Sequence, residues 1–232
     1  MGGSSSQLNN VLIFGLNNAG KTKFLYSTFL DFGEMTIDPT VGFNCEEVDT
    51  PYGKVNLWDI GGHEFLRNFW HFYSNRVPVR ACIFIINTID FERFPEAQSE
   101  LLKIMYEPTL QGTILAVIFN SYKPPPNQKE CPYSQKMLET IFKMQKLRAV
   151  FDVKSFLIDV GKKKECMVAI EWIMNKIERR DKLQKAKEKA AEKERKEQEA
   201  KNNAPGDDKK MDEINAMMKN LGGEGKADKT RI

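Results

Sequence analysis

The chain has 232 residues, of which 41% are hydrophobic and 29% charged, and its formal net charge is +3. This size suits one folded domain with an additional segment, and the small net charge argues against nucleic acid as a partner. No apolar run approaches the ~20 residues of a membrane-spanning helix, and the N-terminus lacks the basic start of a secretory signal. The scattered cysteines have no metal-ligand spacing and favour a reducing, cytoplasmic location.

The chain changes composition near residue 178. Up to about Ile177, apolar runs alternate with helical patterns, which is typical of an α/β domain with a largely parallel sheet. The residues that follow are mostly Lys, Glu, Ala, Arg and Gln. The predicted organisation is a flexible N-terminus at 1–9, a folded domain at 10–177, a charged helix at 178–203, and a flexible tail at 204–232 with a short amphipathic helix at 211–221.

The first residues fit an acylation signal. Met1 to Ser6 match the M-G-x-x-x-[ST] pattern, which predicts N-myristoylation at Gly2. One myristoyl chain gives only marginal, reversible membrane binding, and no basic patch lies beside it. We therefore expect weak or no membrane contact. A small flexible N-terminus without a lipid is the alternative.

A phosphate-binding motif follows the first predicted strand. Val11–Phe14 is a continuous apolar run, typical of a strand buried on both faces, and a helical pattern follows Thr22. Between them, Gly-Leu-Asn-Asn-Ala-Gly-Lys-Thr matches the P-loop pattern GxxxxGK[ST] in its strand–loop–helix context. Lys21 would reach the β- and γ-phosphates, and Thr22 would bind Mg²⁺. The residues predicted to contact the nucleotide here are Gly15, Asn17, Asn18, Ala19, Gly20, Lys21 and Thr22.

Two further motifs stand downstream, PTVGFN at Pro39–Asn44 and WDIGGHE at Trp58–Glu64. Together with GLNNAGKT they resemble the PTxGFN, WDxGGQ and GLDxAGKT signatures of the Arf and Arf-like small GTPases. The resemblance runs from about Asn10 to Ile177. It implies a Ras-like small GTPase fold of the P-loop class, with a mostly parallel central sheet flanked by helices, which binds GTP or GDP with Mg²⁺.

The resemblance also implies a switch. Thr40 would complete the Mg²⁺ shell and sense the γ-phosphate, and Asp59 would hold Mg²⁺ through water. The N–H group of Gly62 would meet the γ-phosphate, so that these segments are ordered only when that phosphate is present. A capped turn is the alternative for Thr40 and Asp59.

His63 departs from the family pattern, in which most members have Gln to orient the attacking water. The Sar branch of the family has His at this position, and an imidazole can donate or accept the required hydrogen bond. We therefore predict slow GTP hydrolysis that depends on His63 and on a helper protein. A surface histidine in a mobile loop is the alternative.

Three aromatic residues, Phe43, Trp58 and Tyr73, match the effector-facing triad of Arf proteins. The match predicts a surface for a protein partner. Because a helix that packs on a sheet also needs aromatic side chains, an ordinary place in the core is the alternative.

The guanine-reading motif of the family, NKxD, is only partly present after the predicted strand at 114–119. Asn120 matches, but Ser121 lacks the lysine side chain that covers the base. Lys123 replaces the aspartate that accepts hydrogen bonds from guanine, and an ammonium group cannot accept a hydrogen bond.

The last loop of the predicted domain is also altered. Val160 would offer its backbone N–H to the base. In one interpretation GTP or GDP still binds, weakly or with Asp159 taking over the base contact. In the other, selectivity for the base is lost.

The tail contains two predicted helices. In the first, Glu178–Lys182, Asp181–Lys185 and Glu192–Lys196 are favourable i,i+4 pairs without an apolar seam, which indicates a single solvated helix, with coiled-coil pairing as the alternative. In the second, apolar residues have i, i+3, i+4, i+7 spacing and predict docking on a partner or on the domain itself. These residues are Ile214, Met217, Met218 and Leu221.

Two functions fit these features. The first is an Arf-like, Mg²⁺-dependent nucleotide switch that recruits a protein effector. The second is a scaffold on a degenerate GTPase fold, held in a larger assembly such as a ciliary or cytoskeletal structure.

Overall fold

The computed structural model describes residues 9–28, 37–122, 124, 130–202 and 208–221. By its internal contacts the chain divides into two compact units, Met1–Arg180 and Asp181–Ile232. The strands of the first unit are β1 (Asn10–Phe14), β2 (Phe43–Thr50), β3 (Gly53–Ile60), β4 (Val79–Asn87), β5 (Ile114–Asn120) and β6 (Asp152–Ile158). Its shorter helices are α1 (Lys21–Ser27), α2 (Glu64–Arg67), α3 (Trp70–Arg76), η1 (Phe91–Arg93), α4 (Phe94–Met105), η2 (Pro108–Leu110), α5 (Gln135–Ile141) and α6 (Met144–Arg148).

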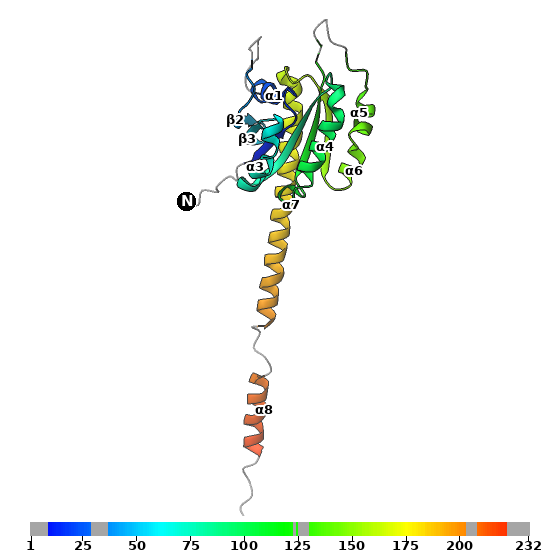
Figure 1. The fold of residues 1–232 in the computed structure, drawn as a ribbon. Helices are drawn as coiled ribbons and strands as arrows, with labels where there is room; N and C mark the ends of the chain where they lie inside the picture. The colour runs from blue at the N-terminus through cyan, green and yellow to red at the C-terminus, as the bar shows by residue number, and fades with distance from the viewer. Residues whose placement is uncertain (1–8, 29–36, 123, 125–129, 203–207, 222–232) are drawn as a thin grey trace, which may run out of the picture. The chain divides into compact units, whose positions relative to one another are not determined.

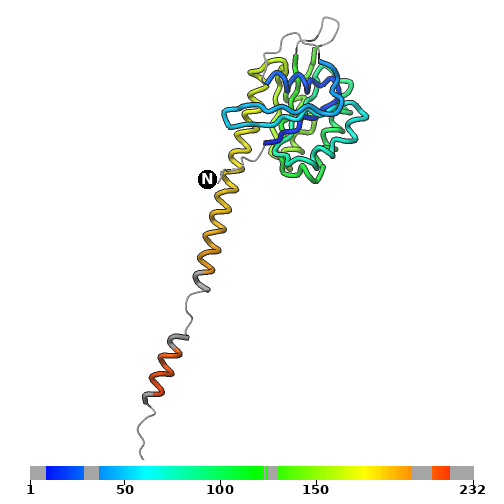
Figure 2. Tube along the Cα trace, turned by 90° about the vertical axis from the view of Figure 1, so that its left-hand side faces the viewer, coloured from blue at the N-terminus to red at the C-terminus, as the bar shows by residue number. Residues whose placement is uncertain are grey.

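The strands form one six-stranded sheet in the order β2-β3-β1-β4-β5-β6 (Figure 1). Only the β2–β3 hairpin, light blue in Figure 2, is antiparallel. Every residue of β1 and β5 is buried, as expected for central parallel strands with helices on both faces. The α/β fold with a largely parallel sheet, predicted from the sequence, is therefore confirmed.

Alternation along the central strands divides the core between the two faces of the sheet. Val11 and Ile13 pack in one apolar cluster with α1 and the first turns of α7 (Lys163–Asn202), whereas Leu12 and Phe14 pack in a second cluster with α3 to α6. Because β1, β3, β4, β5 and β6 are parallel, their carboxyl ends meet at one edge of the sheet. The loops that leave this edge are where an open α/β sheet binds its ligands.

Helix α7 changes character along its length. Up to Ile177 its inward side chains belong to the core, but from Lys182 onward the described side chains are solvent-exposed and mostly charged. The predicted Glu192–Lys196 pair forms there, with 2.7 Å between the carboxylate and the ammonium group. Within the second unit this segment is a solvated, charged helix.

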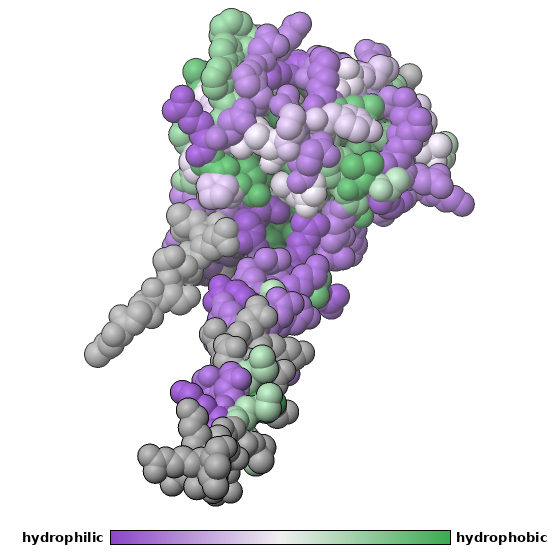
Figure 3. All heavy atoms as spheres, turned by 90° about the horizontal axis from the view of Figure 1, so that it is seen from below, coloured by the Kyte–Doolittle hydropathy of each residue, from purple (hydrophilic) through white to green (hydrophobic). Residues whose placement is uncertain are grey.

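The second unit also contains α8 (Asp208–Leu221), which covers the short amphipathic helix expected at 211–221. Ile214, Met217 and Met218 are exposed on it, and the side chain of Leu221 lies outside the described residues. Figure 3 shows hydrophobic (green) and hydrophilic (purple) residues together on the described part of this unit. Within the described residues, no helix has the length and apolar character needed to cross a membrane.

Candidate functional site

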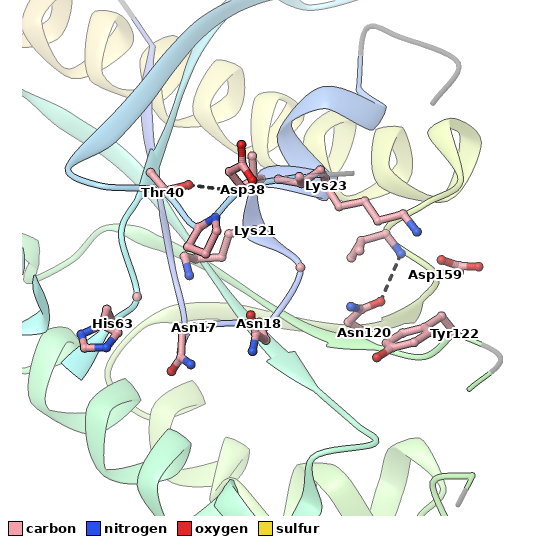
Figure 4. A pocket seen from close by; sticks show the side chains of 16 residues that line it. Asn17, Asn18, Lys21, Lys23, Asp38, Thr40, His63, Asn120, Tyr122 and Asp159 are labelled. Carbon is pink, nitrogen blue, oxygen red and sulfur yellow. Dashed lines mark hydrogen bonds between the residues drawn. The ribbon is translucent and has the colours of Figure 1, made fainter. Parts of the chain in front are cut away.

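A cavity of about 490 Å³ opens at the carboxyl edge of the sheet (Figure 4). Loops that are far apart in the sequence contribute its walls, and they include most of the residues predicted to contact a nucleotide. The lining residues are Asn17, Asn18, Gly20, Lys21, Thr22, Lys23, Ile37, Asp38, Pro39, Thr40, Gly62, His63, Asn120, Tyr122, Asp159 and Val160. Gly15 and Ala19 belong to the same loop as the first of these.

The loop between β1 and α1 is tightly curled. Asn18 and Gly20 have positive φ angles of 61° and 98°, a region that Asn and Gly adopt more readily than other residues. A Cβ atom at Gly20 would come within 2.6 Å of the Asn120 amide nitrogen, so only glycine fits there. This curl turns the loop toward the N-terminus of α1, where backbone N–H groups and the helix dipole favour an anion.

Lys21 is the buried cation of this loop. Its side chain is only 6% exposed, and its ammonium donates to the carbonyl oxygens of Gly15 and Leu16, at 3.0 and 2.9 Å. Burial lowers the pKa of Lys21 to about 8, while the charge of Asp59 opposes and that of Arg67 reinforces this shift. An ammonium group has three donors, so a phosphate oxygen would supply the third acceptor and favour the charged form.

Asp59, at the end of β3, is fully buried beside Thr22 and Thr40. Its Oδ2 atom accepts hydrogen bonds from the hydroxyls of Thr22 at 2.6 Å and Thr40 at 3.1 Å, and from the Asn44 amide at 3.2 Å. Its Oδ1 atom is also buried but has no partner among the described residues.

A buried carboxylate oxygen without a partner is costly and calls for an explanation. Mg²⁺ binds hydroxyl, carboxylate and water oxygens and usually takes its remaining ligands from phosphates. The described residues contain no group of three or more His, Cys, Asp or Glu side chains that would hold a metal unaided. The two threonines with the carboxylate of Asp59 therefore fit Mg²⁺ together with a bound phosphate.

Gly62 lies directly against the phosphate loop. A Cβ atom there would collide with the Gly15 carbonyl oxygen and the Lys21 ammonium. The Gly62 carbonyl accepts hydrogen bonds from the backbone N–H of Asn17 and from the Nε atom of Arg67, both at 3.0 Å. The segment after β3 is thus in contact with the loop that would hold the phosphates.

His63 precedes α2 and lines the cavity, but its side chain is exposed. It is the N-cap residue of α2, but its side chain makes no capping hydrogen bond, and in the described part of the chain no hydrogen bond to its imidazole is present. The ring is therefore available to a water molecule in the cavity. Figure 4 shows His63 on the same side of the view as Thr40.

At the other side of the view, Asn120 joins three loops. Its amide nitrogen donates to the Ala19 carbonyl at 3.0 Å, and its amide oxygen accepts from the Val160 N–H at 3.3 Å (Figure 4). Asp159 and Tyr122 line the cavity beside it. Lys123, which departs from the family pattern, lies outside the described residues.

The predicted aromatic triad does come together. The ring of Phe43 stacks on Trp58 at 5.2 Å between centroids and meets the edge of Tyr73 at 5.6 Å. Phe43 is 47% exposed, whereas the other two rings are partly buried against the core. Three further exposed rings, Phe65, Phe69 and Phe72, lie nearby in the sequence, and the Phe69 ring contacts the other two.

Gly2, the predicted myristoylation site, lies outside the described residues.

Two arginines hold the site in place but were not singled out from the sequence. Arg93 donates from Nη1 to the Asn17 side chain at 2.9 Å and from Nη2 to the Asn17 carbonyl at 3.1 Å. Arg67 is 7% exposed at its side chain and pairs with Glu96 at 2.7 Å. Each contact joins segments distant in the sequence, so no local motif could have indicated it.

Comparisons with known proteins agree with this geometry. A family model described as the ADP-ribosylation factor family matches residues 2–177. ADP-ribosylation factor-like protein 1 of Caenorhabditis elegans is 39% identical over 112 residues, which are 47% of this chain and 59% of that protein. The protein of the same name from Saccharomyces cerevisiae is 38% identical over 124 residues, which are 53% of this chain and 65% of that protein. The chain thus spans less than two thirds of either relative.

A solved structure shows the same fold. The Arl6 BBS3 small GTPase from Trypanosoma brucei, described with a bound nucleotide analogue, GppNp, has a TM-score of 0.63 to this chain. The match covers 74% of this chain and 98% of that one at 19% sequence identity, so it shows the fold alone. The predicted Ras-like small GTPase fold of the P-loop class is confirmed.

Proposed function

The chain belongs to the ADP-ribosylation factor family, as its three motifs predict, and on that premise we propose that it is a Mg²⁺-dependent guanine-nucleotide switch that recruits a protein partner. The observation that carries this proposal is the buried Oδ1 atom of Asp59, unpartnered among the described residues, beside the hydroxyls of Thr22 and Thr40. This arrangement would be unfavourable in a protein with no metal–phosphate ligand, and it becomes satisfied with one.

Each part of the site has a role in this proposal. The curled loop and Lys21 bind the β- and γ-phosphates, and Thr22, Thr40 and Asp59 hold Mg²⁺, which neutralises phosphate charge when bound. Thr40 and Gly62 stand on separate segments that both reach the cavity. A γ-phosphate would therefore order two segments at once, which is how a ligand present in only one state drives a switch.

Hydrolysis, in this proposal, is slow and depends on a helper protein. His63 is at the cavity wall with a ring that makes no hydrogen bond to the described residues, and its role is to orient a water molecule by such a bond. Its exposure explains why a second protein is needed, because an exposed ring is not held in one orientation.

The partner would bind the surface formed by Phe43, Trp58 and Tyr73. These rings lie on strands β2 and β3 and helix α3, next to the segments that the nucleotide would order. Half-exposed aromatic side chains are typical of binding surfaces. In α8 the exposed Ile214, Met217 and Met218, with Leu221 at the matching spacing, are proposed as a second contact with a partner groove. We place the protein in the cytoplasm, with at most weak membrane contact through a myristoyl group on Gly2.

A scaffold role is the second candidate, and the chemistry of Asn120 and Val160 favours it. Their polar groups bond to one another, and the sequence has Lys123 where the NKxD motif has its aspartate. In that case the domain would act as a fixed contact surface in a larger assembly, such as a ciliary or cytoskeletal one.

Substitution of Asp59 separates these two candidates. We expect the purified protein to contain GDP or GTP after denaturation and chromatography, and EDTA to weaken binding of fluorescent GDP. In Asp59→Asn the metal site loses its charge, so we expect a loss of affinity of about tenfold or more and no further effect of EDTA, since a contact to a charged group contributes ~1.5–3 kcal/mol.

The matched control is Asp49→Asn, on the exposed side of β2, which should bind GDP as the unaltered protein does. A protein that purifies without nucleotide and shows no Mg²⁺-dependent binding would instead support the scaffold.

A further inference from the structure

One end of the cavity has polar groups that play no part in binding the phosphates or Mg²⁺. Figure 4 shows Thr40 and His63 at one side of the view and Asn120, Tyr122 and Asp159 at the other. With its phosphates in the loop before α1 and Mg²⁺ beside Thr40, a nucleotide must extend its base toward Asn120 and Asp159. The groups along that wall therefore decide which base is accepted.

Lys23 reaches this wall from the first turn of α1. Its side chain lines the cavity and, in Figure 4, runs toward Asp159 rather than into the phosphate loop. Within the described residues its ammonium has no hydrogen bond or ion pair. Lys23 is therefore a cation at the cavity wall whose ammonium has no acceptor among the described residues.

Gly161 leaves room for the end of the Lys23 side chain. Gly161 is not among the glycines with a positive φ angle, so its backbone does not require glycine. A Cβ atom there would come within 2.8 Å of the Lys23 Cε atom and 3.0 Å of its Nζ atom. The missing side chain of Gly161 thus makes the space that the end of Lys23 occupies.

Two other polar groups on this wall already have partners. One oxygen of the Asp159 carboxylate accepts the Gly161 N–H at 2.9 Å, and the other lies 3.9 Å from the Lys162 ammonium. The Asn120 amide bonds on both its oxygen and its nitrogen. The ammonium of Lys23, in contrast, has three N–H donors, and none of them has an acceptor among the described residues.

We propose that Lys23 contacts the base and makes the pocket select bases with a carbonyl oxygen at this edge, namely guanine, hypoxanthine and xanthine, over adenine. An ammonium group only donates hydrogen bonds, so it pairs with a carbonyl oxygen and finds no acceptor in the exocyclic amine of adenine. This cation from α1 takes over base recognition where the NKxD lysine and aspartate are missing. The inference rests on the proposed function, because the phosphate end must first hold a nucleotide.

The test measures the affinity of the full chain for fluorescent GDP, IDP, XDP and ADP with Mg²⁺. We expect similar affinities for the three oxopurine nucleotides and an affinity about tenfold lower for ADP, as for one hydrogen bond to a charged group. Lys23→Met keeps the aliphatic stem and removes the charge. It should weaken oxopurine binding about tenfold to the level of ADP and leave ADP binding unchanged.

Two further variants sharpen this test. Lys164→Met removes an exposed lysine in the first turn of α7 that does not line the cavity, so it should not alter the ratio of GDP affinity to ADP affinity. Gly161→Ala introduces the Cβ that would displace Lys23, so it should reduce the ratio as Lys23→Met does. The double variant should be no worse than either single variant, because both remove the same contact. Circular dichroism melts of all variants report whether they fold.

The outcomes distinguish this inference from the proposed function. If the unaltered protein binds all four nucleotides equally, or if Lys23→Met keeps the full GDP-to-ADP ratio, Lys23 does not read the base, although the phosphate site stands. If the protein binds none of the four, the proposed function fails and this inference fails with it.

Discussion

At the scale of single residues, the site depends on charged side chains that are buried, although the fold itself does not require charges in its interior. Asp59 and Lys21 are charged and almost fully inaccessible, with 0% and 6% exposure. Burial of a charge is unfavourable unless a partner compensates it, and among the described residues each of these groups retains one unfilled hydrogen-bonding position. Such groups mark a place where ligand binding and stability are linked, because a ligand that satisfies them stabilises the folded state.

His63 allows a prediction at the same scale. We expect His63→Ala to bind GTP normally but to lose GTP turnover by about 100-fold or more, the effect expected when a group that positions a proton or a water is removed. Single-turnover phosphate release, with and without a cell extract as a source of helper protein, measures it. Glu64→Ala, an exposed neighbour outside the cavity lining, is the control. Equal rates for His63→Ala and the unaltered protein would remove His63 from the mechanism.

At the scale of elements, the short helix α2 is attached to α4 by a buried cation. Arg67 contacts Glu96 and, at 3.8 Å, Glu100, and it also donates to the Gly62 carbonyl. With only four residues α2 cannot be stable alone, so its position depends on this tertiary contact. The segment that meets the phosphate loop is therefore held in place by α4.

Removal of this cation should loosen the element. In Arg67→Met we expect the unfolding free energy to fall by about 1–3 kcal/mol, less than for a fully buried pair because Glu96 is partly exposed. Amide hydrogen exchange should accelerate around Gly62 and α2. Lys54→Met breaks the exposed pair with Glu47 and should leave both measurements unchanged. Equal effects of the two variants would contradict the anchoring role of Arg67.

At the scale of the whole molecule, α7 serves two units. Its first turns complete the core with buried residues that include Ile173, Met174 and Ile177, whereas the described side chains after Asp181 are exposed. Burial of three such apolar side chains contributes roughly 1.5–3 kcal/mol each, which is comparable to the whole stability of a domain. The folded domain thus needs the start of α7 and not its continuation.

Truncation tests this division. A chain that ends at residue 184 should fold and bind GDP as the full chain does, whereas a chain that ends at residue 171 should not fold. Thermal melts and GDP titration provide the measurements. If the chain ending at 184 lost nucleotide binding, the exposed part of α7 would have a role in the site that its contacts do not indicate. A chain ending at 171 that melted cooperatively would contradict the importance of the α7 core residues.

The local features of this protein could be predicted from its amino-acid sequence. The strand–loop–helix around Gly15 to Thr22, the alternation that buries β1 and the two downstream motifs are read from adjacent residues, because helix and strand periods and loop chemistry act over a few positions. They predicted the fold and the family. Tertiary structure alone decided that Lys23 meets Gly161, that Arg93 holds Asn17, and that one oxygen of Asp59 has no partner within the described chain. These contacts join residues that only the packed sheet brings together, and no spacing in the chain encodes them.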